Sequence, residues 1–161
     1  MKGFVVLLRH GIAEDKSGDK SDAERKLTET GKRRMKKIAR ALARVFPEAE
    51  ALYSSPLVRA VETSAVVEKA YGGELRTQTT ELLKPDADVK DFRRLLADMT
   101  AQFAIFVGHE PNLTEITLDL TGIRSHSEIE LKKGGCYGIR VDEGSAQLEW
   151  MLPPRILRED E

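Results

Sequence analysis

Two uninterrupted apolar runs stand out in the hydrophobic pattern of the chain, at residues 4–8 and 103–107. Runs of this length without alternation are typical of strands buried on both faces, as in parallel sheets. Arg9-His10-Gly11 follows the first run and Gly108-His109-Glu110-Pro111 follows the second. Open α/β sheets bind ligands at the carboxyl ends of their strands. The pattern therefore predicts that both histidines lie at such an edge, with Gly11 allowing a sharp turn.

Helical and extended patterns alternate along the rest of the first 120 residues. Apolar residues at helical spacing predict a helix over residues 28–46, with Thr28 as its N-cap. We interpret Ser55-Pro56 as the N-cap and first residue of a second helix that continues to Ala70. The other expected elements are strands at 51–54 and 75–79, helices at 88–99 and 112–120, and a turn at Gly72-Gly73. This alternation favours a mainly parallel sheet covered by helices.

The end of the chain has a different pattern. Two short strand-like segments, 136–141 and 146–152, flank Asp142-Glu143-Gly144-Ser145, which predicts an antiparallel hairpin. The expected fold is α/β: a single three-layer α/β/α domain over residues 1–161, whose mainly parallel central sheet carries the C-terminal antiparallel hairpin at one side. Disorder is expected only at the charged residues 158–161.

The composition is that of a globular protein of ordinary size. The 161 residues include 26 Lys and Arg and 27 Asp and Glu, and a net charge of −1 gives no bulk attraction to nucleic acid or membranes. Cys136 is the only cysteine, so no intramolecular disulfide can form and secretion is not indicated. The apolar run near the N-terminus is too short for a signal peptide or a membrane span. We therefore expect a cytoplasmic protein, of an oligomeric state that the sequence does not indicate.

The predicted helix over residues 28–46 has a basic face. Its cations come without an acid among them, and they are Lys32, Arg33, Arg34, Lys36, Lys37, Arg40 and Arg44. Such a face is typical of a solvated helix surface, which is the interpretation that we favour. The alternative is that these charges steer phosphorylated substrates toward the protein.

The candidate chemistry rests on Arg9, His10, Arg59 and His109, which follow strands or lie in the first turn of a helix. Two guanidinium groups suit a tetrahedral oxyanion, because each presents a planar fork of donors, and the positive end of a helix dipole adds to them. A histidine between such cations stays neutral and can attack phosphorus. A second histidine can stabilise charge on the transferred group. The pattern thus indicates a phosphate site.

These residues resemble the histidine phosphatase superfamily, also called phosphoglycerate-mutase-like. The resemblance rests on Arg9-His10-Gly11, on Arg25-Lys26-Leu27-Thr28-Glu29-Thr30-Gly31, on Ser54-Ser55-Pro56-Leu57-Val58-Arg59-Ala60 with Thr63, and on Gly108-His109. In length and in the stretch Leu83-Lys84-Pro85-Asp86, the chain is most similar to the short phosphohistidine phosphatases of the SixA type. The resemblance implies a phosphatase that needs no metal or other cofactor.

The resemblance also implies roles for individual residues. His10 would be the nucleophile that becomes phosphorylated, Arg9, Arg59 and His109 would bind the phosphoryl group, and Arg25 would lie at the edge of the pocket. Larger members of the family place a general acid after the third strand. Glu81, Asp86 and Asp88 are candidates here, and the sequence does not decide among them.

Several residues have a plainer interpretation. We expect His126 to be a surface residue and Cys136 a core residue rather than a nucleophile beside His109. The glycine pairs Gly72-Gly73 and Gly134-Gly135 are expected to form turns, since neither has the lysine and helix of a phosphate loop. No two histidines have metal-ligand spacing, so no metal site is expected.

The sequence leaves the substrate open. The predicted activity is removal of phosphate from a phosphorylated protein, above all from phosphohistidine, and the alternatives are small phosphate esters, polyphosphate, or a binding module without turnover. A mutase is disfavoured because the interval between Arg59 and His109 is short, and a strand and a helix occupy most of it.

Overall fold

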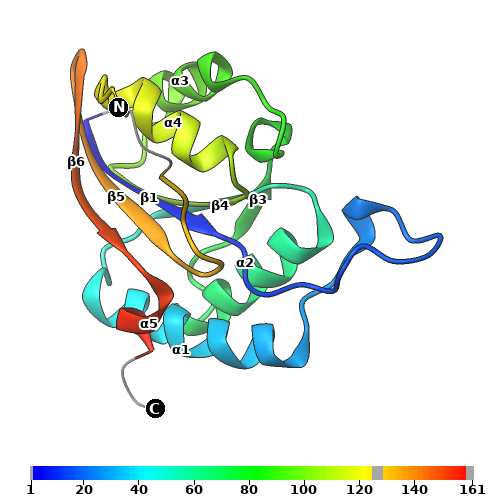
Figure 1. Cartoon of the computed structure of the whole chain (residues 1–161). Coiled ribbons are helices and arrows are strands. Elements are labelled where there is room, and N and C mark those ends of the chain that lie inside the picture. Colours follow the sequence, from blue (N-terminus) through cyan, green and yellow to red (C-terminus); the bar gives the residue numbers. More distant parts are fainter. Residues whose placement is uncertain (1, 125–128, 159–161) are drawn as a thin grey trace.

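The computed structural model describes residues 2–124 and 129–158 and contains a central sheet of six strands (Figure 1). The strands lie in the order β3-β2-β4-β1-β5-β6. The first four of these pair in parallel, and β5 pairs antiparallel with both β1 and β6. Their bounds are β1 Gly3–Arg9, β2 Ala51–Ser54, β3 Thr77–Thr79, β4 Phe103–Gly108, β5 Cys136–Asp142 and β6 Ser145–Leu152.

Helices cover both faces of the sheet. On one face lie α1 (Glu29–Val45), α2 (Val58–Ala70) and the short α5 (Pro154–Leu157), and on the other lie α3 (Val89–Asp98) and α4 (Asn112–Thr121) (Figure 1). Two single-turn 3-10 helices, η1 (Asp22–Glu24) and η2 (Glu81–Leu83), interrupt the connections. The predicted three-layer α/β/α class, with its mainly parallel sheet and terminal hairpin, is confirmed.

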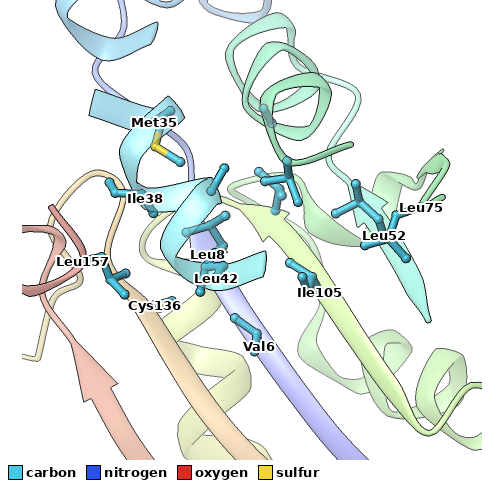
Figure 2. Close-up of a cluster of buried hydrophobic side chains, with 14 of the residues drawn as sticks. Val6, Leu8, Met35, Ile38, Leu42, Leu52, Leu75, Ile105, Cys136 and Leu157 are labelled. Atoms are coloured by element: carbon cyan, nitrogen blue, oxygen red, sulfur yellow. The ribbon is translucent and has the colours of Figure 1, made fainter. Parts of the chain in front are cut away.

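The two central strands have side chains buried on both faces, which explains why their sequences do not alternate. Val6 and Leu8 point into the cluster beneath α1 and α2, where Met35 and Ile38 pack (Figure 2). Val5 and Leu7 point into the opposite cluster with residues of α3 and α4. Because both faces are dry, neither strand has a polar position before its last residue.

Several element boundaries differ from the sequence prediction. The second helix begins at Val58 with Leu57 as its N-cap, so Ser55-Pro56 is not a cap and first helical residue. The third strand starts at Thr77 rather than at residue 75, because its pairing with β2 begins at Leu52 and Thr77. Leu75 lies before the strand and is buried in the core beneath the helices. Thr28 does cap α1, since its side chain accepts a hydrogen bond of 3.0 Å from the backbone N of Gly31.

The turn before β5 holds the backbone that follows β1. Gly134 has φ of 83°, a conformation that favours glycine, and its N–H donates to the carbonyl oxygens of Arg9 and His10. The N–H of Arg9 in turn donates to the oxygen of Gly135 at 2.9 Å. The glycine pairs at 72–73 and 134–135 therefore lie in turns, as predicted. The turn at 134–135 fixes the backbone at Arg9 and His10.

Two sequence expectations concern residues outside the described part of the chain. His126 belongs to residues 125–128, and Glu159, Asp160 and Glu161 to the C-terminal end, none of which the structure describes. Among the residues that it does describe, no helix is long and apolar enough to cross a membrane.

Replacing Gly31 by alanine is expected to lower the free energy of unfolding by about 1–3 kcal/mol, as overpacking does in a tightly packed site. A Cβ atom at Gly31 would lie 2.1 Å from the carbonyl oxygen of Ile12, which is backbone and cannot swing away. The loss is expected although alanine is the better helix former. Denaturant unfolding measures it, with Thr30→Ala in the same turn as the control. A Gly31→Ala protein as stable as the parent contradicts this close approach.

Candidate active site

The carboxyl ends of β1 and β4 bring His10 and His109 together. Arg9 lies opposite Gly108 in the parallel pair, so the next residue of each strand leaves the sheet at the same edge. The two ring centroids are 5.0 Å apart, and the residues are only 5% and 2% exposed. The two histidines thus share one nearly dry site.

The hydrogen bonds of His10 fix which ring nitrogen carries the proton. Its Nδ1 lies 2.7 Å from the carbonyl oxygen of Gly11, and because a carbonyl can only accept, Nδ1 is the donor. The unprotonated nitrogen is then Nε2, which accepts a hydrogen bond of 3.3 Å from Nε of Arg59. The reactive lone pair of His10 therefore faces a cation.

Ser55 lies beside the ring of His109. The Ser55 oxygen accepts from the backbone N of Leu57 at 3.3 Å and lies 2.8 Å from Nε2 of His109. A hydroxyl both donates and accepts, so this contact holds the His109 ring without fixing its tautomer. The Nδ1 of His109 is buried and has no partner among the described residues. A buried polar nitrogen without a partner is costly, so it is a place for a ligand.

Arg59 is held by a carboxylate that the sequence analysis missed. Its Nη1 donates to the carbonyl oxygen of Asp22 at 2.7 Å, and its Nη2 to the Asp22 carboxylate at 3.1 Å. Arg25 binds the other carboxylate oxygen through Nε at 2.9 Å. One aspartate therefore joins two of the arginines expected at a phosphate site. The only sequence signal was its place three residues before the motif that begins at Arg25.

Arg9 is anchored from the opposite side of the site. Its Nη1 donates to the carboxylate of Glu130 at 2.9 Å and also to the carbonyl oxygen of Leu131. Its Nε is buried without a partner among the described residues. The segment before β5 thus holds the Arg9 guanidinium through Nη1 and leaves the buried Nε–H group without a partner among the described residues.

Gly11 and Thr63 connect the chain after β1 to α2. The N–H of Gly11 donates to the Thr63 hydroxyl at 3.1 Å, and that hydroxyl donates to the carbonyl oxygen of Arg59 at 2.8 Å. Gly11 lies in neither a turn nor a bend, so the prediction of a sharp turn there is wrong. A Cβ at this position would lie 2.6 Å from Cγ of Met35, so the Met35 side chain would have to shift.

Burial and positive charge keep both histidines neutral. Burial, followed by the charge of His109 and then those of Arg59 and Arg9, lowers the pKa of His10 to about 2. Burial and then Arg59 lower the pKa of His109 to about 3. Burial alone would raise the pKa of Asp22, but the arginines outweigh it and hold that pKa below its ordinary value. The site thus combines neutral imidazoles with an ionised carboxylate.

None of the three expected acids has a clear catalytic placement. Asp88 caps α3, with its carboxylate accepting from the backbone N of Lys90 at 2.9 Å. Glu81 is paired with Lys84, and Asp86 is exposed. The sequence analysis overlooked Glu110, which directly follows His109. Burial raises the pKa of this carboxyl, and its Oε1 is buried without a partner among the described residues.

Neither Cys136 nor a metal cluster adds chemistry at this edge. Cys136 is fully buried in the core, as predicted, and burial raises the pKa of its thiol to about 12. Within residues 2–124 and 129–158, no three His, Cys, Asp or Glu side chains gather into a group that could hold a metal ion.

Comparisons of the sequence with known proteins identify the family of the chain. Residues 5–85 match the family model of the histidine phosphatase superfamily (branch 1). An uncharacterised protein of Picosynechococcus sp. is 31% identical over 148 residues, which cover 90% of this chain and 88% of that protein. The matched segment of the family model contains Arg9, His10, Arg25 and Arg59. The chain therefore belongs to the histidine phosphatase superfamily.

Solved structures show the same fold. The protein histidine phosphatase SixA, complexed with tungstate, superposes with a TM-score of 0.80 at 22% identity over 96% of this chain and 99% of that chain. A mycobacterial glucosyl-3-phosphoglycerate phosphatase, solved with VO3, gives 0.75 at 14% identity over 94% and 98%. The resemblance to SixA-type phosphatases noted from the sequence is thus confirmed for the fold, and membership of the family supports phosphatase activity.

The free energy of unfolding is expected to fall as the pH drops below about 6.5. There the unfolded chain protonates both histidines, whereas the folded chain protonates them only near their lowered pKa values of about 2 and 3. Each histidine adds a slope of up to about 1.4 kcal/mol per pH unit. Denaturant unfolding between about pH 4.5 and 8 measures this, with His109→Asn expected to have the shallower slope. Equal slopes in the two proteins contradict a neutral buried His109.

Proposed function

We propose that this protein is a metal-independent phosphatase that acts through a covalent phosphohistidine on His10, with phosphohistidine in proteins as its preferred substrate. One observation carries the proposal: the unprotonated Nε2 of His10 lies beside Arg59 in a buried site, while Nδ1–H is held by the Gly11 carbonyl. A neutral imidazole whose lone pair faces a cation is prepared to attack an anionic phosphoryl group.

In the first step, Nε2 of His10 forms a bond to phosphorus as the bond from phosphorus to the leaving nitrogen breaks. The imidazolium that develops on His10 is stabilised by its hydrogen bond to the Gly11 carbonyl. The leaving group departs as the neutral imidazole of the substrate histidine. In the second step, water attacks phosphorus, the bond to Nε2 breaks and inorganic phosphate leaves.

Arginines and the second histidine would bind the phosphoryl oxygens. Arg59 would use the N–H groups that Asp22 does not take, and Arg9 would use those that Glu130 and Leu131 do not take. Arg25 lies on the other side of Asp22. With its proton on Nδ1, a nitrogen that has no partner among the described residues, His109 would supply a neutral donor. These groups provide the positive charge that Mg²⁺ provides in many phosphoryl-transfer enzymes. Tungstate in SixA and VO3 in the mycobacterial phosphatase are oxyanions of related shape and support such a role.

The preference for phosphohistidine follows from the leaving group. An alkoxide leaves poorly without a general acid, which contributes typically about 10²- to 10⁴-fold, whereas solvent can protonate the imidazole of phosphohistidine before cleavage. Of the three acids that follow β3, Asp88 caps α3, Glu81 is paired with Lys84 and Asp86 is exposed. If none of them serves as the general acid, the site favours cleavage of a P–N bond over that of an alkyl ester.

A second candidate function is hydrolysis of small phosphate esters. The observation that favours it is Glu110, a partly buried carboxyl beside His109 whose pKa is raised by burial. A protonated Glu110 can give its proton to an ester oxygen. The mycobacterial phosphatase of the same fold acts, by its name, on a small phosphorylated sugar acid.

Replacing His10 by alanine is expected to abolish turnover, because it removes the lone pair of Nε2 that lies beside Arg59. The parent protein, incubated with a phosphohistidine peptide and a metal chelator, should accumulate a phosphoprotein that is stable in alkali and lost in acid. Mass spectrometry under alkaline conditions locates it. Glu143→Gln, in the exposed turn between β5 and β6, is the control and should react normally. A phosphoryl group on aspartate or serine, or activity that requires added Mg²⁺, contradicts the mechanism.

The kcat/KM for a phosphohistidine peptide is expected to exceed that for glycerol phosphate by more than about tenfold, which is about 1.4 kcal/mol of transition-state preference. Steady-state kinetics on both substrates measure this ratio. Four variants test the acid: Glu81→Gln, Asp86→Asn, Asp88→Asn and Glu110→Gln. All four should retain activity on the phosphohistidine peptide.

Two results decide for the ester phosphatase instead. One is equal kcat/KM for the two substrates in the parent protein. The other is a large loss of phosphohistidine hydrolysis in any of the four carboxyl variants. A protein that binds phosphate or vanadate and hydrolyses neither substrate is a binding module.

A further inference from the structure

A groove between α1 and α2 combines a cationic rim with an apolar floor. The two helices pack against each other on the same face of the sheet (Figure 1). The hollow has a volume of about 440 Å³, and its lining consists of Lys36, Arg40, Ala65, Val66, Lys69 and Ala70. Every charged residue in this lining is a cation, and every other residue is aliphatic.

The cations of the groove form no ion pair within the described chain. Lys36, Arg40 and Lys69 are exposed and form no ion pair with any other residue of the described chain. The helix α1 has no acidic residue after Glu29. The groove therefore keeps its full positive charge in a protein whose net charge is only −1.

The two acids of α2 are engaged elsewhere. The Glu62 carboxylate accepts from the backbone N of Leu27 at 2.6 Å, and the Glu68 carboxylate accepts from the backbone N of Thr77 at 2.5 Å. Each satisfies a backbone donor outside its own helix. Neither forms an ion pair with Lys36, Arg40 or Lys69.

The arrangement works against the stability of α1. Lys36, Arg40 and Arg44 follow one another at intervals of four residues, so their charges lie in a row on one side of the helix, and like charges at this spacing repel. A solvated helix surface gains nothing from such a row. An anionic partner would gain from it, because it would face several cations at once.

The groove lies within reach of the catalytic pocket. Arg59 is in the first turn of α2 and Ala65 is six residues further along, a rise of about 9 Å. An extended chain spans that distance in about three residues. A segment lying in the groove can therefore be joined to a phosphohistidine at His10 by a short spacer.

We propose that the groove between α1 and α2 is a docking site for an acidic segment with aliphatic side chains on the phosphorylated protein substrate. Carboxylates of the segment meet Lys36, Arg40 and Lys69, and an aliphatic side chain packs on Ala65, Val66 and Ala70. This inference rests on the proposed function, since it gives the same enzyme a second contact with its substrate. The apolar floor selects a protein segment over a plain polyanion, because only the former supplies apolar side chains.

Two synthetic peptides test the docking site. Both carry a phosphohistidine and a Gly-Ser spacer of about five residues; one continues into a segment of glutamate and leucine, and the other has glutamine in place of each glutamate. At low salt, kcat/KM for the acidic peptide should be about tenfold higher, through a lower KM. The advantage should shrink at high salt, where exposed charges are screened.

The triple variant Lys36→Glu, Arg40→Glu, Lys69→Glu should lose the advantage and hydrolyse the glutamine peptide at the parent rate. Lys90→Glu on α3, in the opposite layer, is the single-charge control and should keep the advantage. The parent protein and the triple variant should hydrolyse free phosphohistidine, which has no segment to dock, at the same rate. Arg40→Glu alone relieves repulsion within α1, so its melting temperature should not fall, and a loss of docking is then not a loss of folding.

Equal kcat/KM for the two peptides in the parent protein overturns the proposal, as does a triple variant that still prefers the acidic peptide. Should no phosphohistidine compound be hydrolysed, the proposed function fails, and the docking site is judged by binding alone. Fluorescence anisotropy of the unphosphorylated peptides then decides: tighter binding of the acidic peptide, lost in the triple variant, supports docking, and equal binding rejects it.

Discussion

The parallel pairing of β1 with β4 is the interaction on which the site depends. Its register places Arg9 opposite Gly108, so that two histidines distant in the sequence leave the sheet side by side. The pair holds because both strands are apolar on both faces and are covered by helices of two layers. A shift of one residue would exchange the faces of a strand and separate the rings. The geometry of the site is thus maintained by the core beneath it.

Around this pair, the fold controls charge through contacts that lie well apart in the sequence. Arg59 comes from α2, Asp22 and Arg25 from the segment around η1, and Arg9 is anchored by the segment before β5. Burial together with these cations keeps the histidines neutral, while the same cations keep Asp22 ionised. A compact cationic site with two neutral imidazoles suits an anionic phosphoryl group, because the arginines supply positive charge while the imidazoles stay unprotonated in the neutral pH range.

The helices α1 and α2 serve both the site and the surface. Their N-terminal halves are fixed to the segment that follows β1, by the close approach of Gly31 to Ile12 and by the hydrogen bond between Thr63 and Gly11. Their later turns line the basic groove, whose cations form no ion pair within the described chain. In the proposed enzyme, the reaction would take place at the carboxyl edge of the sheet, and the groove between α1 and α2 would select the protein substrate.

Local patterns in the sequence determined the class of fold, most element positions and which residues are candidates for catalysis or phosphate binding. Apolar runs, helical periodicity and turn residues depend on neighbours a few positions away. The helix cap at Thr28 and the hairpin around Gly144 are therefore predictable. The roles of Ser55 and Gly11 were misread, because what they contact lies on other elements: His109 for the one, Met35 and Thr63 for the other. Asp22 and Glu110 were missed for the same reason. Only the tertiary structure decided which carboxylates are tied to arginines and which are buried, since both depend on segments that the sequence does not show to be adjacent.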